Sequence, residues 1–489
     1  MSRKRRSQDV RQPKKPCRWQ GRCRNKTHFV ELLHWFLPEG ELFSKDEFHG
    51  NTRWNPRQLA AQALVWSWQE TKHVTDAFAH ALEVCDELGW KKTAMTYTAF
   101  MNALNRYDDV WMRRLRERCQ ALAEQVGGRF FRSGDWLLIG FDGSRATAPR
   151  TVSNERAFCA PNYGSGTRAK YGKKKSQGLR RKRNKQHPPH PPAPQAWITM
   201  MWHMGLRLPW TWRLGPSHAS ERDHVKEMLA AEEFPENTLF CGDAGFVGYP
   251  LWQAILQADG DFIVRVGANV NLLSKHAEVK KAGGGIVLCW PKGQRESGKP
   301  PLRLRLVKVQ VGKTKMWLLT SVLDPRRLSR KQIVRVYQMR WGIELEFRGL
   351  KQTIDKHQLR CRNSDRLLVE LNWSLCGMAV AELLALREQI AARPERQPDN
   401  YNPQDRSLAS TMRALRSNMR NLTKYCDAAE NLLQALSQAK VQRYKNRTDK
   451  RARYRPANPD KKPLGEPKVR KLSPQECETL KTHDHRVAA

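Results

Sequence analysis

The sequence predicts a mixed α/β domain, residues 131–365, that is preceded and followed by helical regions. Two observations lead to this expectation. Short continuous apolar runs in the middle of the chain are typical of buried strands, and two of them lead into an aspartate. The flanking residues 27–130 and 366–445 instead repeat their apolar side chains at helical spacing. With 489 residues, the chain is long enough for two to four domains.

Two aspartates follow apolar runs in the central region. Asp142 ends the run that starts at Trp136, and Asp243 ends the run that starts at Thr238. We expect each to be the tip of a buried strand, although aspartates at strand ends are also common as turn formers. Around them the sequence predicts two strands and a helix, and then a helix and a strand, at 196–204, 208–214, 217–231, 249–256 and 261–266.

A β-strand insertion is expected at residues 267–315. Leu302–Val311 alternates apolar with basic or polar side chains, a pattern typical of a strand with one buried face. Just beyond it, Trp317 opens the run Trp317-Leu-Leu-Thr320. The ordinary interpretation of Trp317 is a tryptophan buried in a core strand.

The segment from Tyr337 to Lys351 is predicted to be one mostly buried helix that carries a polar stripe. Tyr337, Arg340, Glu344 and Lys351 are separated by steps of three, four and seven residues, which places them within an arc of about 60°. A polar stripe on a buried helix is costly unless it faces a cleft, a metal ion or a ligand. The alternative is a surface helix with a ladder of ion pairs. Glu346 points to nearly the opposite face.

This spacing of Tyr, Arg, Glu and Lys resembles the YREK signature of bacterial insertion-sequence transposases of the DDE class. All four positions match, at Tyr337, Arg340, Glu344 and Lys351. The resemblance implies that Glu344 is the third catalytic metal ligand and that the other three contact the transposon-end DNA. In that family a Trp before a Leu-Leu-Thr strand stacks on a flipped base, which gives Trp317 a second, DNA-binding interpretation.

The resemblance also implies the fold. The predicted order of strands, helices and acids is that of the ribonuclease-H-like catalytic core, in which Asp142, Asp243 and Glu344 would come together. Members of the family carry a β-insertion at this point and have a helical domain before the core that binds the transposon end. Residues 27–130 correspond to that helical DNA-binding domain, and 366–445 to a C-terminal helical region.

Three carboxylates brought together repel one another unless cations occupy the site. Oxygen ligands suit Mg²⁺ or Mn²⁺, and two such ions can assist an in-line displacement at phosphorus. Asp142 is then the shared ligand, while Asp243 and Glu344 each complete the shell of one ion. Arg340 and Lys351 would fix the scissile phosphate as charged donors.

The formal net charge of +40 favours a polyanionic partner. Three segments, 1–26, 164–195 and 440–471, together carry thirty of these net charges. We interpret 1–26 as a basic arm, 164–195 as a basic, proline-rich insertion and 446–489 as a basic tail. Each is expected to be a solvated segment that contacts phosphates without reading sequence.

The chain is expected to act in the bacterial cytoplasm, on the nucleoid. No apolar core follows the basic start, and the longest apolar run, Leu375–Ala381, is too short to span a bilayer. Eleven scattered cysteines argue for a reducing compartment. Cys17 and Cys23 lie near His28, but no paired CxxC accompanies them, so the sequence gives little indication of zinc.

Together these features predict a DDE transposase that binds terminal inverted repeats, cuts the ends of its insertion sequence and joins the 3′ ends to target DNA. Its partners would be double-stranded DNA and, as in the resembled family, a second copy in a synaptic dimer. Two alternatives remain open. One is a ribonuclease-H-like nuclease without strand transfer, and the other is a non-catalytic, end-binding regulator, which the acidic triad argues against.

Overall fold

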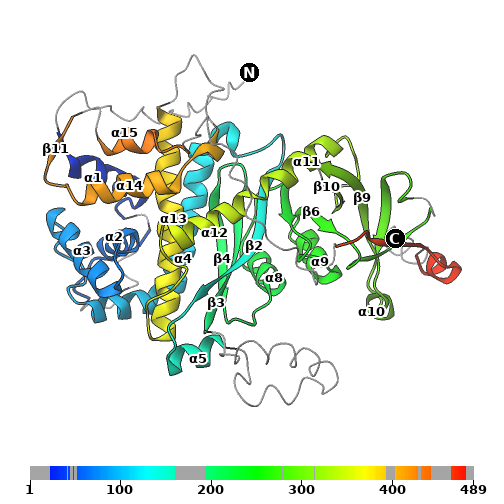
Figure 1. Cartoon of the computed structure of the whole chain (residues 1–489), viewed down its shortest axis with the longest axis horizontal. Coiled ribbons are helices and arrows are strands. Elements are labelled where there is room, and N and C mark those ends of the chain that lie inside the picture. The colour runs from blue at the N-terminus through cyan, green and yellow to red at the C-terminus, as the bar shows by residue number, and fades with distance from the viewer. Residues whose placement is uncertain are drawn as a thin grey trace, which may run out of the picture.

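A computed structural model describes residues 23–40, 42–43, 48, 52–159, 193–276, 279–312, 314–392, 402–427, 431–441 and 464–480. Residues 1–22 of the basic arm, nearly all of the basic insertion, and the parts of the basic tail on either side of 464–480 lie outside these described residues. The last four residues of the predicted arm, 23–26, instead belong to a strand and to the start of a helix. Figure 1 shows a helical part on one side of the molecule and a large sheet that extends away from it.

One mixed sheet of ten strands organises the described chain. Counted from one edge, its first five strands are β4 (Leu208–Gly215), β3 (Gln195–His203), β2 (Leu137–Thr147), β5 (Thr238–Gly242) and β6 (Asp261–Val266), in that order. The pairs β2–β3 and β3–β4 are antiparallel, whereas β2–β5 and β5–β6 are parallel. This arrangement confirms the mixed α/β class. β5 is buried throughout, and β6 is buried except at Asp261 and Arg265, as expected for strands covered on both faces.

Short helices join and cover these strands. They are α5 (Val152–Phe158), α8 (Glu221–Ala231), α9 (Tyr249–Gln257), α11 (Arg330–Met339) and α12 (Gly342–Gln352). The predicted helix 217–231 begins at Glu221, and Ser220 caps it, because the Ser220 hydroxyl accepts a hydrogen bond from Asp223 N at 3.3 Å.

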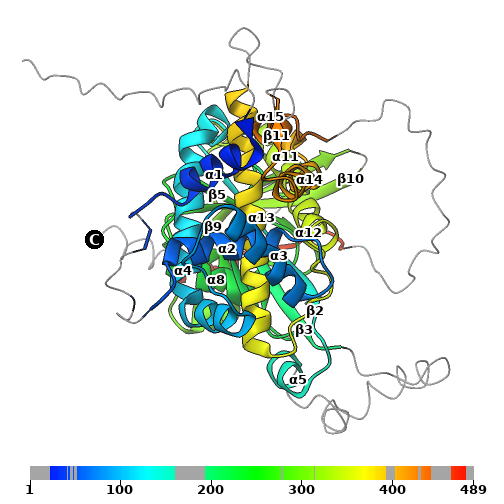
Figure 2. The same cartoon turned by 90° about the vertical axis from the view of Figure 1, so that its left-hand side faces the viewer.

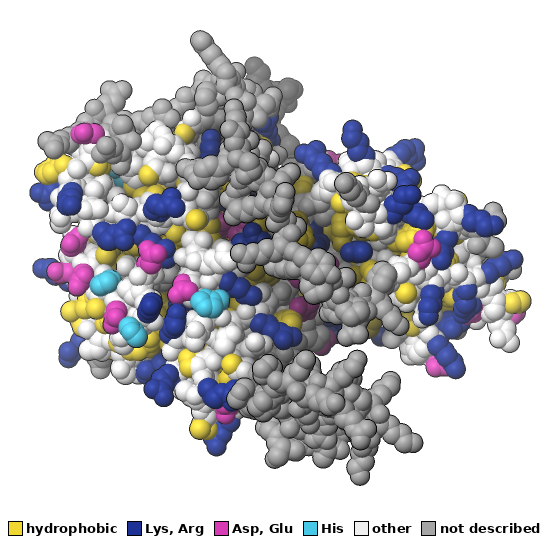
Figure 3. Space-filling model, viewed as in Figure 1, with side chains coloured by type: hydrophobic (Ala, Val, Ile, Leu, Met, Phe, Trp, Pro, Cys, Tyr) yellow, Lys and Arg dark blue, Asp and Glu magenta, His cyan; other side chains and the backbone are white. Residues whose placement is uncertain are grey.

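The β-insertion continues the same sheet beyond β6. Its strands follow in the order β10 (Thr314–Thr320), β9 (Leu302–Val311), β8 (Gly284–Cys289) and β7 (Asn271–Ser274), and α10 (Lys292–Glu296) joins β8 to β9. Lys and Arg side chains are spread over its surface in Figure 3. The predicted alternation in β9 fails at Arg305, which is 7% exposed. The guanidinium of Arg305 is accommodated because it donates a hydrogen bond to the Leu328 carbonyl oxygen at 2.5 Å.

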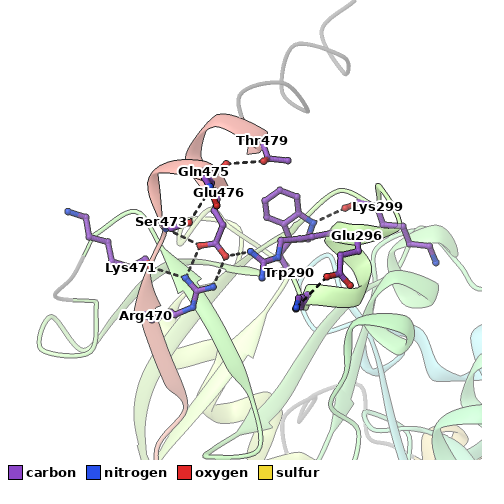
Figure 4. Close-up of polar contacts among 11 residues, drawn as sticks. Trp290, Glu296, Lys299, Arg470, Lys471, Ser473, Gln475, Glu476 and Thr479 are labelled. Atoms are coloured by element: carbon purple, nitrogen blue, oxygen red, sulfur yellow. Dashed lines mark hydrogen bonds and ion pairs between the residues drawn. The ribbon is translucent and has the colours of Figure 1, made fainter.

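Residues 464–480, predicted to be part of a basic tail, instead complete the β-insertion. β12 (Lys468–Lys471) pairs in parallel with β7 at the edge of the sheet, and residues 474–480 are helical. Arg470 donates hydrogen bonds to Glu476 at 2.7 and 2.5 Å, and Ser473 N donates to the same carboxylate at 2.9 Å (Figure 4). This segment also closes a small apolar core made of Leu273, Leu288, Trp290, Leu472 and Leu480. Apolar residues spaced among the charges, rather than charge alone, therefore decide its fold.

The two predicted helical regions pack together. The N-terminal helices are α1 (Asn25–Phe36), α2 (Pro56–Trp68), α3 (Val74–Glu87) and α4 (Tyr97–Gly127), followed by the 3₁₀ turn η2 (Gly128–Phe130). The C-terminal ones are α13 (Ser364–Ala391), α14 (Leu408–Met419) and α15 (Leu432–Ser437), with the 3₁₀ turn η4 (Pro403–Asp405). A two-stranded sheet, β1 (Cys23–Arg24) with β11 (Tyr425–Cys426), joins the two sets.

The long helix α13 lies at the centre of this helical part. It packs against α4, α2, α14 and α15, and both views show it running along the helical part of the molecule (Figures 1 and 2). The indole of Trp68 donates a hydrogen bond to the Gly377 carbonyl oxygen at 2.8 Å. Among the described residues α13 is the one helix long and apolar enough to cross a membrane, but 89% of its apolar window is buried inside the protein. Its composition is therefore that of a core helix.

Candidate active site

Asp142 and Asp243 lie beside each other at the end of the parallel strands. β2 and β5 pair in register up to Gly140 and Cys241, so each aspartate comes two residues after the last pair. The prediction that Asp142 ends its strand is wrong, because β2 continues to Thr147 along the antiparallel partner β3. Asp142 thus lies just beyond the point where the parallel pairing of β2 with β5 ends. Asp243 immediately follows the end of β5, as predicted.

Backbone amides orient both carboxylates. Gly143 N donates a hydrogen bond to Asp142 Oδ1 at 2.8 Å, and Gly245 N donates to Asp243 Oδ1 at 2.7 Å. In each aspartate, a backbone amide thus fixes the oxygen Oδ1, and the second oxygen, Oδ2, accepts no hydrogen bond from these amides. Both sites are fixed by rigid strands, which is the support that a precise catalytic geometry needs.

The helix predicted from Tyr337 to Lys351 is divided in two. α11 ends at Met339 and α12 begins at Gly342, and the backbone between them makes the i→i+3 hydrogen bonds of a tighter turn, such as Glu344 N to Trp341 O at 3.2 Å. Gly342 packs directly against the Trp202 ring of β3, where a Cβ atom would overlap the indole. The break therefore lets the chain approach the sheet, and the expected single arc of four side chains is wrong.

Arg340, at this break, lies between the carboxylates of Asp142 and Glu344. Its Nη1 lies 3.7 Å from Asp142 Oδ2 and its Nη2 lies 3.6 Å from Glu344 Oε1. The guanidinium carbon is 5.6 Å from the centre of the Tyr337 ring, and both side chains are largely buried. Burial raises the pKa of Tyr337, which keeps its hydroxyl neutral. Tyr337 thus packs against Arg340 inside the protein and does not face solvent.

Lys351 joins the site through a cavity. A hollow of about 300 Å³ is lined by Asp142, Gly143, Ser144, Glu344, Phe347, Arg348, Lys351 and Gln352. Burial lowers the pKa of the Lys351 ammonium from its ordinary value. Asp243 is not among the residues that line this hollow. The structure therefore brings Asp142, Glu344, Arg340 and Lys351 into one site, with Asp243 at its margin. Arg348 is an additional cation there that the sequence analysis did not single out.

The electrostatics of Asp142 reflect a crowded group of carboxylates. Burial raises its pKa to about 6; the Gly143 amide and Arg340 lower it, whereas the negative charges of Asp243 and Glu344 raise it further. Since Asp142 is affected by both other acids, the three share one electrostatic site.

Glu221 is a fourth carboxylate that the sequence analysis missed. It is the first residue of α8, and its carboxylate packs against Gly143, next to Asp142. Burial raises its pKa to about 7, and the charges of Asp142 and Asp243 add to this effect, whereas Arg145 and Arg222 oppose it. From sequence alone an acid in the first turn of a helix is explained by the helix dipole, so no local signal distinguishes Glu221.

The chemistry of the donor set fits a hard divalent cation, because every candidate ligand is a carboxylate oxygen. Within the part of the chain that the structure describes, no three Cys, His, Asp or Glu side chains are arranged to hold a metal ion. Arg340 bridges Asp142 and Glu344 instead and partly balances their charge. The carboxylates thus have the right chemistry for Mg²⁺ or Mn²⁺. To bind an ion they would have to move closer together than they are in this structure.

Two further predicted features can be placed. Trp317 is 3% exposed on β10, between β6 and β9, and its burial favours the core interpretation over contact with a flipped base. Glu346 faces away from the site, as predicted. It is 1% exposed, and its Oε1 lies 3.0 Å from Arg207 Nη2.

Part of the chain matches a known protein family. Residues 201–378 match the family model described as "Transposase DDE domain". That segment contains Asp243 and the whole Tyr337–Lys351 stretch, while Asp142 lies before it. The match supports a transposase-type enzyme that modifies nucleic acid, and it covers somewhat over a third of the chain.

The putative transposase y4zB of Sinorhizobium fredii (strain NBRC 101917 / NGR234) is similar to part of the chain. The two are 27% identical over 156 residues, which is 30% of this chain and 43% of that protein. The chain thus matches less than half the length of this relative. A solved piggyBac transposase synaptic complex with hairpin DNA aligns with 86% of this chain and 84% of its own chain, at 13% identity and a TM-score of 0.37. A likeness that weak carries no argument about function. The family match and the curated relative together support an insertion-sequence transposase.

Proposed function

We propose that this protein is the transposase of an insertion sequence, which cuts the ends of the element and joins the 3′ ends to target DNA. The observation that carries the proposal is that Arg340 contacts both Asp142 and Glu344, while the charge of Asp243 acts on Asp142 from the margin of the same site. These four side chains come from β2, from the end of β5 and from the junction of α11 and α12. They are separated by up to about 200 residues of sequence, so only a folded site explains their proximity.

The fold supports the same proposal. The strand order β4-β3-β2-β5-β6, with the first three strands antiparallel and the last two parallel to β2, is what we expect of a ribonuclease-H-like core. On this view the first acid comes from the first strand, the second follows the fourth strand and the third comes from the helix after the β-insertion. The finer fold name rests on this topology.

In the proposed reaction Asp142, Asp243 and Glu344 hold Mg²⁺ or Mn²⁺. Two such ions would activate a nucleophile and stabilise the leaving oxygen at phosphorus. Lys351 lines the hollow, and Arg340 contacts Asp142 and Glu344, which also line it. As charged donors, the two cations would orient a scissile phosphate there. Tyr337 holds Arg340 in place through its ring. Double-stranded DNA is the proposed substrate, and a pair of transposase chains would bring two ends together.

Cleavage and joining on defined DNA test the proposal. The substrate is a labelled duplex containing the sequence that flanks the gene for this protein, incubated with Mg²⁺, Mn²⁺ or a chelator. A transposase releases 3′ ends at the element boundary and joins them to a target plasmid, only with a divalent ion. Cleavage without joined product would favour the nuclease alternative. Specific binding with no cleavage under any ion would favour the end-binding regulator.

A further inference from the structure

A cavity of about 880 Å³ lies between the helices α8 and α9 and the outer strands of the β-insertion. Its walls come from α9 and the loop before it, from β7, β8 and α10, and from the C-terminal strand β12. Several of the residues that line it are exposed, so the cavity opens to solvent. The acidic hollow shares none of these lining residues.

The lining of this cavity is strongly basic. None of the described residues that line it is an acid, whereas six are Lys or Arg: Arg222, Lys280, Lys292, Arg295, Lys468 and Arg470. They are contributed by α8, by the β-insertion and by the C-terminal strand, so the fold itself gathers them. A cavity in which cations converge in this way attracts an anionic ligand.

Two of these cations show that the wall can hold an oxyanion. The Glu476 carboxylate accepts hydrogen bonds from Arg470 at 2.7 and 2.5 Å and from Ser473 N at 2.9 Å (Figure 4), and it also pairs with Arg295. Planar guanidinium groups recognise carboxylate and phosphate with the same fork of donors. Glu476 thereby fixes both arginines at the cavity.

Three lysines of the lining remain available to a ligand. Lys280 Nζ lies 3.4 Å from Glu466 Oε2, and Lys292 Nζ lies 3.6 Å from Glu296 Oε1. These pairs are exposed and contribute little free energy, so a ligand phosphate can replace either carboxylate. For Lys468, no ion pair is found within the part of the chain that the structure describes.

The cavity begins beside the acidic site. Arg222, in its lining, directly follows Glu221, the fourth carboxylate of that site. Asn269, also in the lining, donates a hydrogen bond through Nδ2 to the carbonyl oxygen of Ala244 at 3.1 Å. Ala244 is the residue after Asp243. A nucleic-acid strand that leaves the acidic site on the Asp243 side therefore meets this cavity next.

We propose that the cavity binds, through its phosphates, a single strand of DNA that continues beyond the scissile phosphate. The inference rests on the proposed function, which supplies that strand. A duplex is too wide to enter a cavity of this size, whereas a few unpaired nucleotides fit it. The aromatic rings of the lining, Tyr249, Trp252 and Trp290, are at most 3% exposed. The affinity should therefore come from charge rather than from stacking.

Binding of overhanging DNA by the full-length protein tests the proposal. With a chelator present to prevent cleavage, wild type should bind a duplex that carries an overhang of about four nucleotides about 5-fold or more tightly than the blunt duplex. Lys292→Ser combined with Lys468→Ser should lose this gain. Lys315→Ser combined with Lys331→Ser removes two exposed cations that do not line the cavity, and this matched control should retain the gain. Fluorescence anisotropy measures both affinities.

Photocross-linking locates the bound strand. A 4-thiothymidine in the overhang should cross-link to peptides that contain residues 247–252, 269–273 or 289–292, which line the cavity. Unchanged melting temperatures of both double variants exclude a loss of folding.

Three results would each overturn the proposal: no gain from the overhang in wild type, an equal loss of the gain in both double variants, or cross-links confined to other segments. Displacement of the overhang by free thymidine monophosphate at the same nucleotide concentration would also overturn it, because the occupant would then be a free nucleotide. Intact overhang binding by a protein that cleaves DNA with no divalent ion would instead refute the proposed function alone.

Discussion

Asp142 shows how one residue can report on the whole acidic site. Its carboxyl is buried beside Asp243 and Glu344, and its pKa is about 6. Because this pKa is raised above that of the unfolded chain, Asp142 favours the folded state at low pH, and this contribution is lost as the pH rises from about 4 to about 6. Ionised Asp142 therefore destabilises the metal-free protein at neutral pH.

This linkage gives a pH-dependent prediction. In the absence of divalent ions, Asp142→Asn should melt at a higher temperature than wild type at pH 7.5, and the difference should shrink toward zero near pH 4. Thermal unfolding across this pH range measures it, with the exposed Asp86→Asn on α3 as the control. A melting difference that is independent of pH would contradict the crowded-carboxylate description.

Glu346 gives a second prediction about stability, at a residue outside the acidic site. It is buried against Arg207, close to the buried pair Glu382 and Arg406. Removing one partner leaves a buried charge without compensation, so Glu346→Ala should cost about 3–5 kcal/mol of unfolding free energy. Glu344→Ala, two residues away and 37% exposed, should change stability little. Denaturant titration of both variants checks this, and equal effects would be evidence against the assigned orientations.

At the scale of elements, the break between α11 and α12 positions the site. It turns Arg340 toward Asp142 and places Glu344 in the first turn of α12. Gly342 permits the break because the Trp202 ring occupies the space where a side chain would lie. The geometry of the third acid thus depends on one close approach between a helix and β3.

Gly342→Ala should therefore damage both stability and activity. Overpacking of this kind costs about 1–3 kcal/mol, and the displaced α12 should carry Glu344 away from the other acids. Gly293→Ala in α10, where no atom lies within 4 Å of the added carbon, is the matched control. Melting temperature and end cleavage measure the two effects. Full cleavage by Gly342→Ala would show that the break does not position Glu344.

The sequence predicts most elements of the central sheet but not their interruptions. β6 and β9 match their predicted bounds because apolar runs and alternation are local signals. The break at Gly342 depends on Trp202, about 140 residues earlier, and nothing in its own neighbourhood indicates it. Glu221 was missed for the same reason, since its proximity to Asp142 exists only once α8 packs beside β2.

At the scale of the whole molecule, the described part is a helical body joined to a long sheet whose far end is strongly basic. The C-terminal strand β12 returns to that end and completes it, so charge in 440–471 is partly structural. The basic insertion 164–195 contains ten Lys and Arg and no acid. It is therefore the better segment for isolating phosphate contacts from folding.

Replacing these ten cations by Ser should flatten the salt dependence of binding to random duplex DNA. For every phosphate that the variant no longer neutralises, the slope of log affinity against log salt should become shallower by about 0.9. Fluorescence anisotropy over a range of salt concentrations measures the slope, and unchanged melting temperature provides the control. An unchanged slope would place the phosphate contacts elsewhere in the molecule.

The central claim is that Asp142, Asp243 and Glu344 form one metal-dependent catalytic site. The most direct test is the rate of end cleavage by Glu344→Ala and Glu346→Gln, measured with saturating Mg²⁺ on DNA to which both variants bind. We expect Glu344→Ala to bind the ends but to leave them uncut, whereas folded Glu346→Gln cuts them. Cleavage by Glu344→Ala at the wild-type rate would contradict the claim.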